Sequence, residues 1–193
     1  GFNKDDFDVI YAGQSHIDMA WKWRYEQTRQ KGAITFHKAM YHAKNFPGFS
    51  YCASEPILFD WFKEDDPEGF EQLKKVVTEE GIELVGGAYV EPDCMMPSGE
   101  AFVRSRLLGM RFYKEHFGED NLPKVEYFLD SFGYNYGLPQ ILKKSGAEYF
   151  WTSKITWNRQ TIFPFVNFLW RSPDGTEILT SNFKQMMGVL DEW

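Results

Sequence analysis

Short apolar runs alternate with longer amphipathic segments along most of this chain. That alternation favours parallel strands joined by crossover helices, and so predicts an α/β fold. The predicted strands are residues 7–13, 49–54, 82–90, 125–130 and 147–153. The predicted helices are residues 22–45, a bent pair over 56–80 around Pro67, 98–118 and 138–146.

The pattern changes after Trp157. The stretch FVNFLWRSPDGTEILTSNF predicts two strands that flank the turn SPDGTE, which is typical of a hairpin and not of another crossover. We find no internal repeat, low-complexity segment or linker, so residues 1–193 are predicted to form one domain without an internal boundary. Four crossovers suit either an open sheet or part of a barrel.

Composition narrows the classes of partner. The net charge is −7, and no stretch combines clustered basic residues with regularly placed aromatics, so we expect a neutral substrate and no nucleic acid. No run approaches the roughly 20 apolar residues that a spanning helix needs, and the N-terminal residues lack the pattern of a secretory signal, so no membrane partner is expected. Cys52 and Cys94 lie far apart without a CxxC partner, which favours a reducing, cytoplasmic location.

Polar and aromatic residues cluster directly after the predicted strands. The C-terminal edge of the strands is where the loops of α/β proteins assemble active sites, so these residues are predicted to share one rim. They are Gln14, His16, Asp18 and Trp21 after the first strand, Glu91 and Asp93 after the third, Asp130 and Phe132 after the fourth, and Lys154 after the fifth.

Three of these side chains suit a metal ion. His16 and Asp18 lie two residues apart, so in an extended segment they point the same way and can meet one ion, and Asp130 can join them from the fourth strand. A neutral imidazole with two carboxylates suits zinc or a similar divalent ion, although the oxygen-rich set could also hold a harder cation. Taken without further context, a His and an Asp at this spacing more often form a hydrogen-bonded surface pair than a metal site, and Asp130 could be a turn or helix-cap residue.

Longer motifs around these residues carry a family resemblance. The chain contains SHIDMAWKW near its start, VGGAYVEPDCMMPSGEAFVR in its middle, and LDSFGYNYGLPQILKKSGAEYFWTSKITWN followed by FLWRSPDGTEILT. In this order the blocks resemble glycoside hydrolase family 38, the retaining α-mannosidases, and particularly its bacterial and cytosolic-type members. The resemblance implies the larger part of a seven-stranded β/α barrel, present here as an incomplete N-terminal portion of the catalytic domain.

The resemblance also implies roles for the site residues. It makes His16, Asp18 and Asp130 ligands of a zinc ion, or of another divalent cation, and it makes Asp130 the nucleophile that forms a covalent glycosyl-enzyme intermediate with a terminal α-linked mannose. It makes Trp21 an aromatic that packs against the sugar, Phe132 an aromatic lining the same pocket, and Lys154 a basic residue near the nucleophile.

Parts of the family's site are expected outside this chain. The fourth metal ligand of the family is a downstream His, but no His follows residue 116, and the acid/base Asp is expected beyond residue 193. We therefore predict that the fragment alone is inactive, and that its apolar faces are covered by the remainder of a parent chain or by self-association into a homo-oligomer. Two local departures are Gln14 and Tyr89, where many relatives have His and Trp.

Some assignments remain open at this stage. Glu91 and Asp93 face the predicted rim and could support the ligands or bind the sugar. A catalytically incomplete module that binds sugar or metal is one alternative function. A metal-dependent carbohydrate deacetylase is another, although the H-x-x-x-H pair that such chemistry needs is absent.

Overall fold

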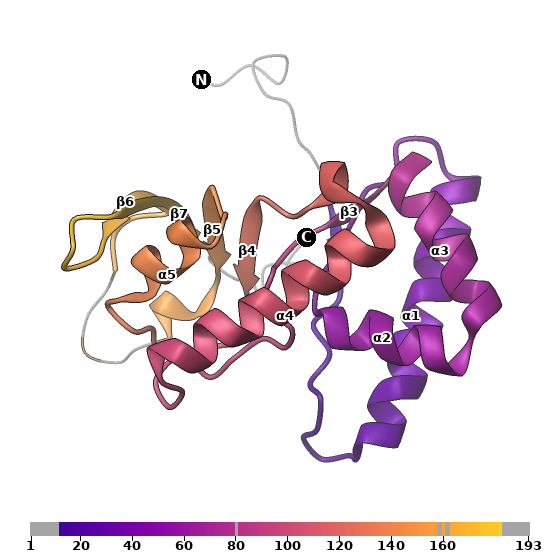
Figure 1. Ribbon diagram of the computed structural model, residues 1–193, viewed down its shortest axis with the longest axis horizontal. Coiled ribbons are helices and arrows are strands. Elements are labelled where there is room, and N and C mark those ends of the chain that lie inside the picture. The colour runs from indigo at the N-terminus through magenta and orange to yellow at the C-terminus, as the bar shows by residue number, and fades with distance from the viewer. Residues whose placement is uncertain (1–11, 80, 158–159, 161–162, 183–193) are drawn as a thin grey trace, which may run out of the picture.

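The computed structural model describes residues 12–79, 81–157, 160 and 163–182. The described part is an α/β structure with two sheets and helices packed against them (Figure 1). The predicted α/β class is therefore confirmed. Residues 7–11 of the first predicted strand lie outside the described residues.

The first sheet holds three parallel strands in the order β1-β2-β3. Its strands are β1 (Gly13–Gln14), β2 (Tyr51–Ala53) and β3 (Ile82–Leu84). The helices of this half are α1 (Tyr25–Asn45), α2 (Pro56–Asp65) and α3 (Pro67–Glu79). The break between α2 and α3 falls at the predicted bend, where Pro67 has no N–H to donate and starts the second helix. An aromatic core fills this half, and the Phe36 ring in it contacts the rings of both Phe59 and Phe62.

The second sheet holds four strands in the order β4-β5-β7-β6. They are β4 (Val125–Phe128), β5 (Tyr149–Thr152), β6 (Asn167–Arg171) and β7 (Glu177–Asn182). β6 and β7 pair antiparallel, which confirms the predicted hairpin, while β7 returns parallel to β5. The helices of this half are α4 (Gly99–Phe117), α5 (Leu138–Lys144) and two short 3-10 helices, η2 (Glu119–Asn121) and η3 (Lys154–Thr156).

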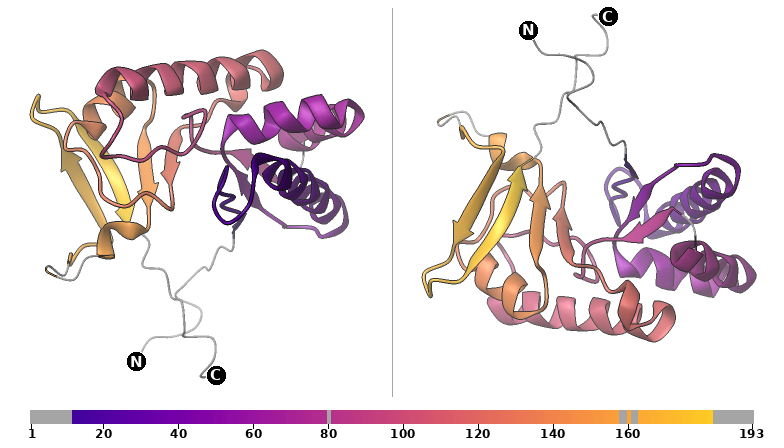
Figure 2. Two further views of the ribbon diagram at one scale, coloured as in Figure 1. Left: turned by 90° about the horizontal axis from the view of Figure 1, so that it is seen from below. Right: turned by 90° about the horizontal axis from the view of Figure 1, so that it is seen from above.

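Helix α4 joins the two halves. It begins after the N-cap residue Ser98, whose hydroxyl accepts a hydrogen bond from Ala101 N at 3.2 Å, and it ends before Gly118, whose φ of 85° suits glycine. Figure 2 shows α4 lying lengthwise along one side of the molecule, and it contacts α2, α3 and α5. Phe102 near its start belongs to the core of the second half, and Phe112 near its end belongs to the core of the first.

A buried ion pair ties α4 to the junction of the sheets. Arg106 of α4 pairs with Glu126 of β4, and both side chains are almost fully buried. Glu126 Oε1 also accepts hydrogen bonds from Gly87 N at 3.0 Å and Ala88 N at 3.4 Å, just beyond β3. Burial lowers the pKa of Arg106 to about 10, which leaves the guanidinium charged at neutral pH.

The two sheets meet between β3 and β4. Gly86 N donates to Val125 O at 2.8 Å, so the chain leaving β3 runs beside β4. The described strands nevertheless form two sheets, and a seven-stranded barrel stays a prediction. No helix in the described residues is both long enough and apolar enough to cross a membrane.

Candidate metal and nucleophile site

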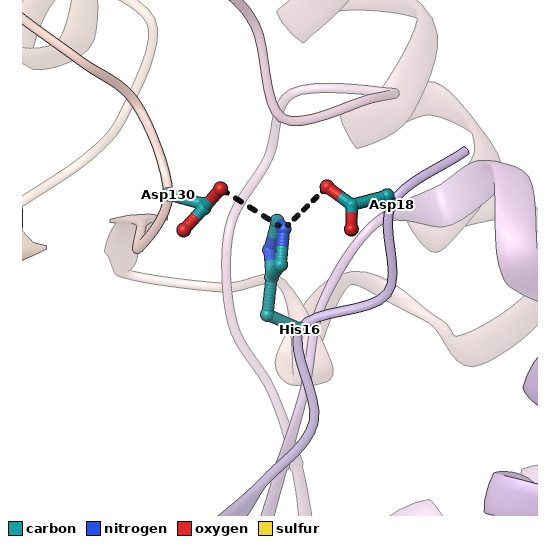
Figure 3. Close-up of side chains that lie close together, drawn as sticks. All are labelled: His16, Asp18 and Asp130. Carbon is teal, nitrogen blue, oxygen red and sulfur yellow. Dashed lines mark hydrogen bonds and ion pairs between the residues drawn. The ribbon is translucent and has the colours of Figure 1, made fainter. Parts of the chain in front are cut away.

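His16, Asp18 and Asp130 converge although they come from different sheets. His16 and Asp18 follow β1, and Asp130 follows β4. His16 Nε2 lies 3.3 Å from Asp18 Oδ1 and 3.8 Å from Asp130 Oδ2, with the two carboxylates on opposite sides of the same ring nitrogen (Figure 3). One candidate ligand atom from each residue lies within 4.8 Å of the other two. The predicted convergence of these three side chains is present.

The donor set fits a divalent cation. Two ligand atoms bound to one zinc ion at about 2 Å in a tetrahedron lie about 3.3 Å apart, close to the separations around His16 Nε2. The side chains are 25% exposed for His16 and 35% for each aspartate, so solvent reaches the cluster. One imidazole and two carboxylates leave room for a further ligand in a four-coordinate site.

Glu91 contacts both sides of this cluster. Its Oε2 lies 2.9 Å from His16 Nδ1, the ring nitrogen that faces away from the two aspartates. Its Oε1 accepts hydrogen bonds from Asp130 N at 2.5 Å and Ser131 N at 3.1 Å. The sequence predicts both Glu91 and Asp93 on the rim and assigns them the same two possible roles. In the structure Asp93 instead closes a turn by accepting hydrogen bonds from Met95 N and Met96 N.

The surroundings of His16 favour its protonated form. Burial by itself lowers the pKa of His16, but the hydrogen bond and negative charge of Glu91, together with Glu55 and Asp18, outweigh burial and raise the pKa to about 9. Without a cation, His16 therefore carries a positive charge among carboxylates at neutral pH. A cation bound there would take the place of that proton.

Lys154 lies on the other side of Asp130. Its side chain is buried, and its Nζ pairs with Asp130 Oδ1. The same Nζ lies 4.2 Å from the centre of the Phe132 ring and 4.1 Å from that of Trp157. Lys154, Phe132 and Trp157 line a cavity of about 340 Å³ together with Gly133, Tyr134 and Ile155. Sequence analysis missed Trp157, and its only sequence signal was its place three residues after Lys154.

Three further residues named from the sequence are Trp21, Gln14 and Tyr89. Trp21 is 67% exposed, and its ring packs edge-on against Trp23. Gln14 is half-buried within β1. The Tyr89 hydroxyl donates a hydrogen bond to Asp60 Oδ2 of α2 at 2.8 Å, so this side chain is directed toward the helices.

Glu55 contacts the backbone of Glu91. It follows β2 with a φ of 64°, and its Oε1 accepts a hydrogen bond from Glu91 N at 3.1 Å. Its Oε2 is buried and has no hydrogen-bond partner among the described residues. Burial, and then the charge of Glu91, raise the pKa of Glu55 from 4.5 to about 7.

Glu55→Gln should therefore make folding stability less dependent on pH. The folded state holds the Glu55 proton more tightly than the unfolded state, so this carboxyl destabilises the protein as the pH rises from 4.5 to about 7. The penalty reaches at most about 3 kcal/mol above that range. Denaturant unfolding at about pH 5 and about pH 8 should show a smaller fall in stability for the variant than for the wild type. The matched control is Glu83→Gln, because Glu83 is exposed on β3. If the stability of Glu55→Gln depended on pH as strongly as that of the wild type, this account of Glu55 would be contradicted.

Comparison with known proteins decides the family. The chain matches the family described as "Glycosyl hydrolases family 38 N-terminal domain" over residues 6–189. The chain belongs to glycosyl hydrolase family 38. The resemblance carried by the sequence motifs is thereby confirmed.

The relatives of this family 38 chain are much longer than the chain itself. It is 40% identical over 174 residues to "Alpha-mannosidase G" of Dictyostelium discoideum, and 35% identical over 173 residues to "Alpha-mannosidase 2C1" of Homo sapiens. Each alignment covers 89% of this chain but only 16% of the relative.

A solved structure shares the fold. The alpha-mannosidase from Enterococcus faecalis V583 superposes with a TM-score of 0.76 at 23% identity, covering 89% of this family 38 chain and 19% of the other. At that identity the likeness supports the arrangement of the described strands and helices, and the site has to be argued from its own residues.

Proposed function

We propose that this chain forms part of the catalytic domain of a metal-dependent retaining α-mannosidase that hydrolyses terminal α-linked mannose. The observation that carries the proposal is the meeting of Asp130 with His16 and Asp18, within a chain that belongs to family 38. Family membership favours glycoside hydrolysis over the deacetylase alternative.

The donor atoms suggest how a cation would be held. His16, Asp18 and Asp130 would bind Zn²⁺ or another divalent ion, and the bound ion would orient the sugar hydroxyls and favour the ionised form of Asp130. The Lys154 ammonium pairs with Asp130 Oδ1, and His16 Nε2 faces the other carboxylate oxygen, Oδ2, so the Asp130 side chain is contacted at both of its oxygens.

Asp130 would act as the nucleophile. Its carboxylate attacks the anomeric carbon and the bond to the leaving oxygen breaks, while a carboxylic acid gives that oxygen a proton. Water then attacks the glycosyl-enzyme ester, the same acid group now takes the proton of the water, and mannose leaves with its original configuration. The exposed rings of Trp21, Phe132 and Trp157 offer flat apolar faces against which a sugar can pack.

We propose that other segments complete this site. The chain spans 16% of the length of each of the two relatives named above, and we expect the acid/base carboxyl and the fourth ligand to come from outside its 193 residues. The same segments, or a second copy of the chain, would cover its apolar faces and complete a seven-stranded barrel. Cys52 and Cys94 are unpaired, which supports a cytoplasmic location for the proposed enzyme.

The test is hydrolysis of an aryl α-mannoside by the full natural protein. Removal of metal by a chelator should abolish hydrolysis, Zn²⁺ should restore it, and NMR of the first product should show the α-anomer of mannose. A first product with the β configuration would contradict the retaining mechanism. Release of acetate from an acetylated sugar, without mannoside cleavage, would support the deacetylase alternative instead.

A further inference from the structure

We propose that Glu91 is a positioning residue that fixes the tautomer of His16 and the place of Asp130 with a single carboxylate. Its effect on any reaction would pass through those two residues. The inference rests on the proposed metal site, and it adds to that site a residue that need not touch the cation or the sugar.

The first step concerns the imidazole of His16. A carboxylate only accepts hydrogen bonds, so the 2.9 Å contact between Glu91 Oε2 and His16 Nδ1 requires a proton on Nδ1. In neutral His16 the proton then stays on Nδ1 and leaves a lone pair on Nε2. Nε2 is the nitrogen that faces Asp18 and Asp130. Glu91 therefore directs the ligand lone pair toward the two aspartates.

The second step concerns the backbone of Asp130. Glu91 Oε1 accepts from the N–H groups of Asp130 and Ser131, the two residues where the chain turns away from β4. The carboxylate is only 8% exposed, so water competes little for these hydrogen bonds. The two oxygens of Glu91 thus contact different residues: Oε2 orients the His16 ring after β1, and Oε1 holds the Asp130 backbone after β4.

The third step concerns how Glu91 itself is held. Its backbone N–H donates to Glu55 Oε1, and the Ser131 hydroxyl donates to the carbonyl of the neighbouring Pro92 at 2.8 Å. The segments that leave β1, β2, β3 and β4 are therefore joined through one side chain and its backbone. That network spans the junction between the two sheets.

Glu91→Gln tests the proposal because an amide cannot replace both carboxylate oxygens. If the amide oxygen faces the two N–H groups, its NH₂ meets His16 Nδ1 and moves the imidazole proton to Nε2. If the amide turns over, its NH₂ faces the N–H groups of Asp130 and Ser131, and those two donors lose their acceptor. Either way one support is lost, and zinc affinity should fall about 10- to 100-fold, the usual effect of removing such an outer partner. The affinity is measured in the full natural protein by competition with a chelating dye.

Asp93→Asn is the matched control. Asp93 lies on the same loop and loses the same single charge, but an asparagine oxygen keeps the hydrogen bonds from Met95 N and Met96 N. Its zinc affinity should equal that of the wild type. Equal affinities for Glu91→Gln and wild type, or equal losses in both variants, would overturn the role of Glu91 while leaving the metal site standing. A wild-type protein that binds no zinc would overturn the proposed function and this inference together.

A second measurement does not depend on the variant folding. In metal-free wild-type protein with ¹⁵N-labelled histidine, at a pH above the raised pKa of His16, NMR should show the proton on Nδ1. A proton on Nε2 would overturn the inference.

Discussion

Asp130→Asn should lower kcat/KM for an aryl α-mannoside by at least about a thousandfold, because a neutral amide cannot form the glycosyl ester that the proposed mechanism requires. The substitution also removes the negative charge that pairs with Lys154 and that faces His16. The measurement is steady-state hydrolysis by the full natural protein, with bound zinc determined on the same samples.

Asp93→Asn provides the control for Asp130→Asn as well. It makes the same chemical change after a neighbouring strand, at a carboxylate whose hydrogen bonds close a local turn, so hydrolysis should stay near the wild-type rate. Activity unchanged in Asp130→Asn, with zinc still bound, would show that another group attacks the sugar.

Arg106→Leu should lower the free energy of unfolding by about 3 to 5 kcal/mol, because it leaves the Glu126 carboxylate buried without its charge partner. Glu126 still accepts hydrogen bonds from Gly87 N and Ala88 N, so it cannot turn toward water without leaving those two donors unpaired. Denaturant unfolding of the wild type and the variant measures the difference.

Arg104→Leu is the matched control on the same helix. Arg104 pairs with Glu100 at 2.8 Å, but both side chains are well exposed, so its loss should cost at most about 1 kcal/mol. The double variant Arg106→Leu with Glu126→Leu should regain part of the stability, since no charge is then left buried alone. Equal losses for Arg104→Leu and Arg106→Leu would contradict the importance given to the buried pair.

Much of the fold could be predicted because local sequence patterns, apolar runs and turn residues, indicate its strands and turns. The apolar runs that predicted β2 to β5 contain the observed strands, and the turn SPDGTE correctly predicted the antiparallel pairing of β6 with β7. The rim was also predictable in part. Residues that directly follow the parallel strands of one sheet or barrel lie at one edge, which predicts that His16 and Asp130 approach one another. The two residues do meet, but they follow strands of two sheets, and the sequence does not indicate that division.

The supporting contacts could not be predicted in the same way, because they depend on irregular backbone. Glu91 and Asp93 are both acidic and lie two residues apart, yet only Glu91 reaches His16, while Asp93 turns back on its own loop. Glu55 adopts a positive φ that is uncommon outside glycine, and no residue pattern around it indicates this conformation. Trp157 comes close to Lys154 only through the short 3-10 helix between them.

Helix α4 has a consequence for how the protein loses its structure. One continuous helix contributes Phe102 to one apolar core and Phe112 to the other, so neither core can open while α4 keeps all of its packing. The two halves are thus expected to melt as a single cooperative unit, with the transient openings that precede global unfolding confined to elements that α4 does not touch. A destabilising substitution in the half that contains Phe36, Phe59 and Phe62 would then also lower the stability of the segment around Asp130. It would do so although none of the residues next to Asp130 is changed.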